Sequence, residues 1–225
     1  MMRIATTVAV ALCASTVLDA GAPAIASAIP PMIVNVTAAS DVAPDLAARI
    51  LAEADRVWRP NGVTFVWRRA ARVVVPYARA SEAGPYVPNT VRLTIGDSRG
   101  PARHGPLALG WILFDDANAP GQEIYLSHAN GLQTLVEARD VVGVVEQMPN
   151  LQRDMLLARA LGRALAHELG HYLLASKMHT ATGMMKASLG AVELFSRESD
   201  AFRLEPAQRS AIAARLRAEP LVARR

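Results

Sequence analysis

Five consecutive residues, His167-Glu168-Leu169-Gly170-His171, combine side chains that bind metals with one that can move a proton. On an α-helix, residues four positions apart lie on one face, so the imidazoles of His167 and His171 can share one ion. Glu168 lies beside them and can reach a water molecule near that ion without being a ligand itself. The pattern predicts one catalytic Zn²⁺ held by the two histidines, with Glu168 as the general base. The alternative is a chance placement of two histidines on a buried helix.

A third zinc ligand is expected, because a catalytic zinc usually has three protein ligands and one open position. His179 is the leading candidate, since three of the five histidines of the chain fall between positions 167 and 179. In an unbroken helix, His179 would lie roughly 12 Å along the axis from His171, too far for both to bind one ion. We therefore expect the helix to end near residues 175–177 and the chain to turn back. The alternative third ligands are carboxylates further along the chain: Glu193, Glu198 and Asp200.

The elements around this helix are predicted from hydrophobic periodicity. Short β-rich runs predict strands at 32–36, 63–67, 91–95, 107–114 and 123–127, with a weaker run at 73–75. Apolar residues at helical spacing predict helices over 41–58, from about residue 150 past His171, over 191–197 and over 205–216. The predicted fold class is α+β, a mixed twisted sheet packed on the long helix that carries His167 and His171, with a C-terminal helix.

The motif His167-Glu168-x-x-His171, the later His179 and the segment Gly183-Met184-Met185 resemble the metzincin branch of the zincin metalloproteases, especially its matrixin-like members. The resemblance implies three zinc histidines around a glutamate base. It also implies a tight turn whose methionine, Met185 or failing that Met184, lies under the metal.

The same resemblance implies that Leu109, Gly110 and Trp111 belong to an edge strand that binds an extended substrate. One departure concerns the turn before the third ligand. The family has a shorter interval between its second and third histidines, with a glycine where the helix turns. Here His179 follows His171 by eight positions, and residues 172–178 include no glycine.

The expected function is a zinc-dependent endopeptidase that hydrolyses a peptide or protein substrate through a zinc-bound water activated by Glu168. Two alternatives stay open: a catalytically weak zinc-binding protein, and a zinc hydrolase of a non-peptide substrate on the same fold. The net charge is +4, but the arginines are scattered and not interleaved with aromatic residues. Nucleic acid is therefore not an expected partner.

The first residues are typical of a secretory leader. Arg3 precedes an apolar stretch over 4–18, which is shorter than the roughly 20 residues that span a bilayer, and Ala26-Ser27-Ala28 forms a cleavage pattern. The single cysteine, Cys13, lies inside the leader, so no cysteine ligand is expected in the mature protein. We expect a signal peptide over 1–28 and one zincin-like metallopeptidase domain over 29–225. The mature protein is expected to be a secreted or periplasmic bacterial monomer without a stable membrane span.

Overall fold

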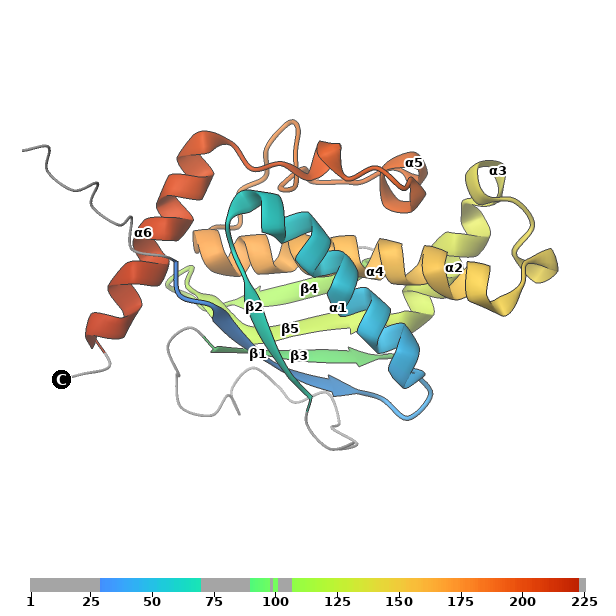
Figure 1. Ribbon diagram of the computed structural model, residues 1–225, viewed down its shortest axis with the longest axis horizontal. Helices are drawn as coiled ribbons and strands as arrows, with labels where there is room; N and C mark the ends of the chain where they lie inside the picture. Colours follow the sequence, from blue (N-terminus) through green and yellow to red (C-terminus); the bar gives the residue numbers. More distant parts are fainter. Residues whose placement is uncertain (1–28, 70–89, 98, 101–106, 223–225) are drawn as a thin grey trace, which may run out of the picture.

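The computed structural model describes residues 29–69, 90–97, 99–100 and 107–222 (Figure 1). The expected signal peptide and the weak strand at 73–75 lie outside these residues. The elements in chain order are β1 (Met32–Ala38), α1 (Pro44–Trp58), η1 (Arg59–Asn61), β2 (Phe65–Arg69), β3 (Thr90–Gly96), β4 (Gly110–Phe114), β5 (Pro120–Ser127), α2 (His128–Glu137), α3 (Arg139–Val142), η4 (Val145–Gln147), α4 (Asn150–Leu174), α5 (Ala191–Phe195), η5 (Asp200–Phe202) and α6 (Pro206–Val222).

The five strands form one mixed sheet in the order β2-β1-β3-β5-β4. Neighbouring strands are parallel, except that β4 runs antiparallel to β5. The mixed sheet was predicted, and β4 begins at Gly110 and not at residue 107. β4 is an edge strand, so the outer side of its backbone can pair with another chain.

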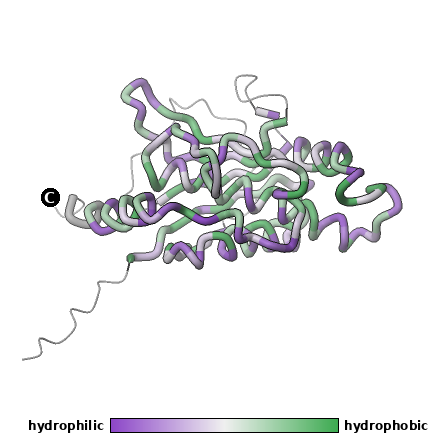
Figure 2. Tube along the Cα trace, turned by 90° about the horizontal axis from the view of Figure 1, so that it is seen from above, coloured by the Kyte–Doolittle hydropathy of each residue, from purple (hydrophilic) through white to green (hydrophobic). Residues whose placement is uncertain are grey.

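One face of the sheet forms the core of the domain. Side chains along β1 and β3 alternate between buried and half-buried, as expected for strands with one covered face. The buried members on these two strands are Met32, Val34, Val36, Val91, Leu93 and Ile95. Helices α1 and α4 pack side by side on this face (Figure 1). Hydrophobic and hydrophilic residues alternate along the chain trace (Figure 2). Burial of these side chains is the main stabilising contribution to the fold.

Helix α4 is the central element of the domain. It contacts α1, β4, β5, α2, α5 and α6, so its second half is covered on nearly every side. Close approach to α1 requires a residue without a side chain at Gly162, where a Cβ would lie 2.5 Å from Cβ of Glu53. Trp58 of α1 donates a hydrogen bond from Nε1 to the carbonyl of Ala166, 3.1 Å away. The residues just before His167 are therefore held firmly in the core.

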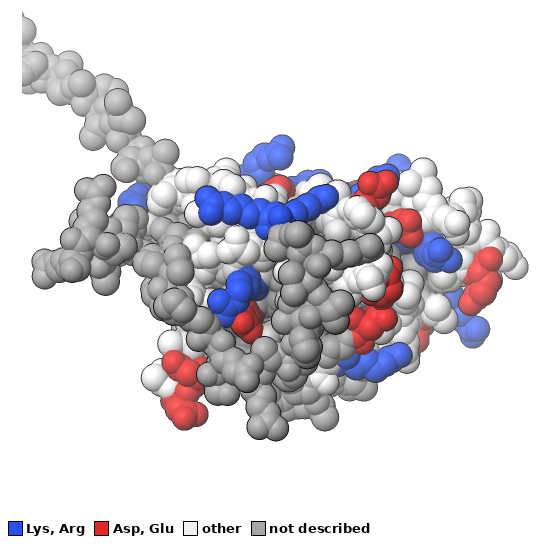
Figure 3. Space-filling model, turned by 90° about the horizontal axis from the view of Figure 1, so that it is seen from below, with Lys and Arg blue, Asp and Glu red and all other residues white. Residues whose placement is uncertain are grey.

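The opposite face of the sheet is more polar. Arg92 on β3 pairs with Glu123 on β5 at 2.5 Å, and the hydroxyl of Tyr125 donates to the same carboxylate. The face of the molecule in Figure 3 likewise shows Lys and Arg interspersed with Asp and Glu. Among the described helices, none is long and apolar enough to cross a membrane.

Helices α2 and α3 were not predicted. Ser127 caps α2 by accepting a hydrogen bond from the amide of Asn130, but Asn130 and Gly131 inside the helix are weak helix formers. Contacts with residues distant in the sequence stabilise the helical conformation of Asn130 and Gly131. Asn130 donates to the carbonyl of Ala108 at 2.8 Å, and a Cβ at Gly131 would lie 2.8 Å from Cδ1 of Leu157.

Candidate metal centre

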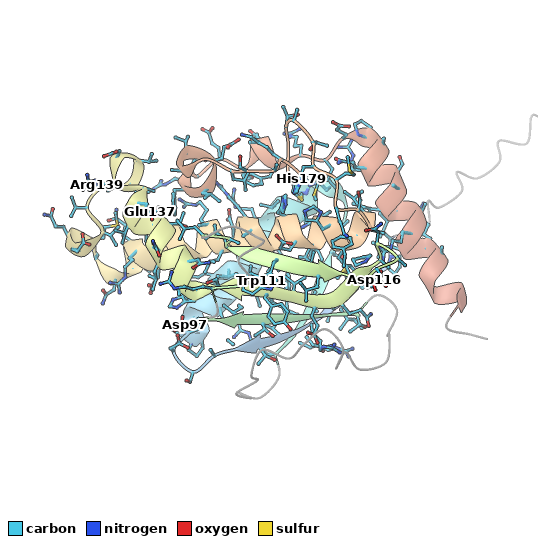
Figure 4. All side chains as sticks on the ribbon, turned by 180° about the vertical axis from the view of Figure 1, so that it is seen from behind. Asp97, Trp111, Asp116, Glu137, Arg139 and His179 are labelled. Carbon is cyan, nitrogen blue, oxygen red and sulfur yellow. The ribbon has the colours of Figure 1, made fainter. Side chains whose placement is uncertain are left out.

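Three histidines converge above the sheet. His167 and His171 project from α4, and His179 reaches them from the loop that follows the helix (Figure 4). Their ring centroids are 4.6 Å (His167–His171), 4.9 Å (His171–His179) and 5.3 Å (His167–His179) apart. One nitrogen from each ring lies within 4.8 Å of the other two, a spacing that suits one shared metal ion.

The end of α4 makes this convergence possible. The helix stops at Leu174, and Ala175 adopts a left-handed conformation with φ 47° and ψ 45°. Its amide, like that of Ser176, turns back to the carbonyl of His171. The chain thus reverses where we expected, although an alanine occupies the place of the glycine that such a turn favours.

The orientation of the imidazoles also suits a metal. Nδ1 of His167 lies 2.9 Å from the carbonyl oxygen of Met184, and Nδ1 of His171 lies 2.7 Å from that of Ser176. A carbonyl oxygen only accepts, so both Nδ1 atoms carry the proton and both Nε2 atoms present a lone pair. The two Nε2 atoms are 2.9 Å apart. Two lone pairs at this distance repel each other unless a cation lies beside them, so this donor set fits zinc.

Burial keeps both helical histidines neutral, the form that binds metals. It lowers the pKa of His171 to about 4, with a smaller contribution from neighbouring His167. It also lowers the pKa of His167, against the opposing effect of the hydrogen bond to Met184.

Glu168 lies in the cleft between α4 and β4, with 8% of its surface exposed. Burial raises its pKa to about 8, and a hydrogen bond from the backbone of Ile112 opposes this shift. A cation held by the histidines would lower the pKa again, because a nearby opposite charge favours the carboxylate. Glu168 therefore has the environment of a group whose charge depends on the metal.

The cleft has a volume of about 940 Å³. One wall is β4 with the residues before it, and the other is the segment 186–189. Leu109, Gly110 and Trp111, expected to bind substrate, all contribute to the first wall. A Cβ at Gly110 would lie 3.2 Å from Cγ of Glu168, so this glycine leaves the base uncrowded. The Trp111 ring is buried and stacks on Tyr125 at 5.6 Å, so it supports the strand and offers no side-chain pocket.

A tight turn lies under the histidines. Gly183 has φ 81°, and the Met184 amide donates to the carbonyl of Arg203 at 3.3 Å. Met184 meets His167 through its carbonyl, whereas the buried Met185 side chain packs on α4 at Gly170. Both methionines thus contact the helix that carries the first two histidines.

The alternative carboxylate ligands lie outside the histidine cluster. Glu193 accepts from Nζ of Lys186 at 2.8 and 2.9 Å and from the amide of Gly190. Asp200 pairs with Arg203 at 3.1 Å, and Glu198 is exposed. Within the described part of the chain, His179 is the residue that joins His167 and His171 in a metal-type cluster.

Arg163, which lies one helical turn before His167, was not predicted to support the site. Its guanidinium is fully buried and pairs with Glu53 at 3.0 Å. It also donates to three backbone carbonyls around α5, those of Glu193, Ser196 and Glu198. The available signal was a charged residue within a largely apolar part of α4, and such a signal cannot reveal distant partners.

No protein-family model matches the sequence, and none of the curated proteins compared with it matches either. Among solved structures, the chain is similar to archaemetzincin from Methanopyrus kandleri, with a TM-score of 0.50 and 15% sequence identity. The similarity covers 83% of this chain and 96% of that one. The chain therefore has a fold similar to that of this archaemetzincin structure. At this identity the likeness concerns the fold alone, and the matrixin-like character stays a prediction.

Proposed function

We propose that the chain is a zinc-dependent endopeptidase in which His167, His171 and His179 hold one Zn²⁺ and Glu168 is the general base. The observation that carries this proposal is the convergence of the three imidazoles, with two Nδ1–H groups directed to carbonyls and their Nε2 atoms turned to a common point. The likeness to archaemetzincin supports the fold that this site requires.

When bound, zinc polarises the scissile carbonyl and makes a nearby water more acidic. Glu168 accepts the proton of the attacking water and returns it to the leaving amine. Its burial between α4 and β4 keeps bulk water away from this transfer. Among the described strands, β4 lies at the edge of the sheet, and such a strand can hold an extended peptide by main-chain hydrogen bonds, which favours peptides over small esters.

We further propose that the substrate is a peptide or protein, that the active form is a matrixin-like monomer, and that it is secreted or periplasmic. The secretory leader pattern in residues 1–28 supports this location. Residues 29–225 would then form the single catalytic domain.

The test is Glu168→Gln, which keeps the shape of the side chain but removes its basicity. The variant should bind zinc like the unsubstituted protein and lose hydrolysis of casein and mixed peptides. Glu146→Gln, at an exposed position in η4, is the matched control and should retain full activity. Undiminished cleavage by Glu168→Gln would refute the role of the base. Turnover of esters without turnover of peptides would favour a non-peptide hydrolase.

A further inference from the structure

The loop that carries His179 is joined to the β4–β5 hairpin by the side chain of Lys177. Its Nζ donates a hydrogen bond to Oδ1 of Asn118, 2.7 Å away, in the turn of the hairpin. The same ammonium group lies 5.2 Å from the centre of the Phe114 ring. Lys177 therefore bridges the two sides of one end of the cleft.

These contacts form a closed ring in which His171 takes part. The edge-on ring contact between Phe114 and His171 is 6.3 Å from centre to centre. His171 in turn donates to the carbonyl of Ser176, next to Lys177. The ring thus runs from α4 to the loop, across to the hairpin and back to α4.

The position of His179 needs such support. His179 is exposed, and the turn before it begins with a left-handed alanine, a conformation that costs an L-residue roughly 1–2 kcal/mol. After His179, the amide of Thr180 donates to the carbonyl of Met185 at 2.8 Å. That bond orients the far end of the loop, whereas Lys177 connects the near end to the sheet.

We propose that Lys177 is a positioning residue, which holds the 175–179 loop against Asn118 and Phe114 so that His179 completes the zinc site. The inference rests on the proposed zinc site and concerns how this chain spans its long interval between the second and third ligands. Electrostatics alone predicts the opposite effect, because a cation near zinc repels it and its removal would tighten binding. The sign of the change in zinc affinity therefore separates the two explanations.

The experiment measures the zinc dissociation constant by competition with a chromophoric chelator. Lys177→Met keeps an apolar stem over Phe114 and removes the ammonium group; it should weaken zinc binding by about 10-fold, at the low end of the range for outer-shell partners. Asn118→Gly should weaken it similarly without loss of fold stability, because residue 118 has φ 61°, which glycine adopts easily. The double variant should be no weaker than either single one, since both remove the same contact.

A spectroscopic readout identifies the ligand that is lost. The visible spectrum of the cobalt(II)-loaded Lys177→Met protein should move toward that of His179→Ala. Arg139→Met is the matched control, since it removes an exposed cation on α3 that takes no part in the ring and does not line the cleft. It should leave zinc binding unchanged or tighter.

Unchanged or tighter zinc binding by Lys177→Met would overturn the inference, as would additive losses in the double variant. Failure of the unsubstituted protein to bind zinc would instead overturn the metal centre, and the positioning role with it.

Discussion

The helical and the loop-borne parts of the metal centre differ in what holds them. His167 and His171 need only a continuous α4, and the helix repeat alone places both rings on one face. His179 is exposed and depends on a left-handed Ala175 and on contacts with a distant hairpin. The difference teaches that two ligands of this site are local features of the sequence, whereas the third is a tertiary one.

The helical part is also the better anchored. Two side chains of α1 hold α4 before His167: Trp58 donates to the carbonyl of Ala166, and Glu53 accepts from Arg163. Arg215 of α6 donates to the carbonyl of Tyr172 just after His171. The loop-borne part has no comparable buried support within the described residues. We therefore expect substitutions to affect the two parts to different extents.

The largest contrast should appear when the ligands themselves are removed. His171→Ala should weaken zinc binding by more than about 100-fold, beyond the range for outer-shell partners, because it breaks the preformed helical pair. His179→Ala should weaken zinc binding less, because the helical pair of His167 and His171 persists. Glu146→Gln is the control, because this exposed side chain belongs to neither cluster of possible metal ligands, and isothermal titration calorimetry measures all three. Equal losses of zinc affinity in His171→Ala and His179→Ala would show that the helical and loop-borne ligands contribute equally.

Arg163→Met tests the anchor of the helical part. The change leaves the Glu53 carboxylate and three carbonyls around α5 without this donor, so the free energy of unfolding should fall by about 3–5 kcal/mol. Urea denaturation measures the change. Arg153→Met, on the more exposed first turn of α4, should stay within about 0.5 kcal/mol of the unsubstituted protein. Similar losses for both variants would show that the buried network is not the anchor.

Gly170→Ala tests the contact between α4 and the methionine turn. A Cβ at this position would overlap the sulfur of Met185, so the free energy of unfolding should fall by about 1–3 kcal/mol. Gly96→Ala is the control, because its Cβ would meet Ala39 at an ordinary 3.6 Å. A Gly170→Ala protein as stable as the control would mean that Met185 is free to move away.

The smallest effect should come from Ala175→Gly, and its sign should be reversed. Glycine takes a left-handed conformation without strain, so stability should rise by about 1 kcal/mol. The same change at Ala52, an exposed residue inside α1, should lower stability by about 1 kcal/mol. Thermal unfolding of the two proteins compares them directly. A loss of thermal stability in both variants would contradict a strained turn at Ala175.

Much of the fold was predictable because its signals are local. The strands that line the core and helices α1 and α4 follow from periodicities of two and 3.6 residues. Helix α2 was missed because its polar residues and glycine are stabilised by neighbours distant in sequence, such as Leu157. The burial of the Trp111 ring against Tyr125 was missed for the same reason.

The sequence by itself determined the helical pair of histidines and the neighbouring glutamate, because a four-residue spacing on a helix leaves little freedom. It favoured His179 as the third ligand but left the carboxylates of Glu193, Glu198 and Asp200 as alternatives. Only the tertiary structure decided that His179 joins the pair while Glu193 pairs with Lys186. The physical reason is that a loop has no repeat of its own, and its conformation is set by the surfaces on which it packs.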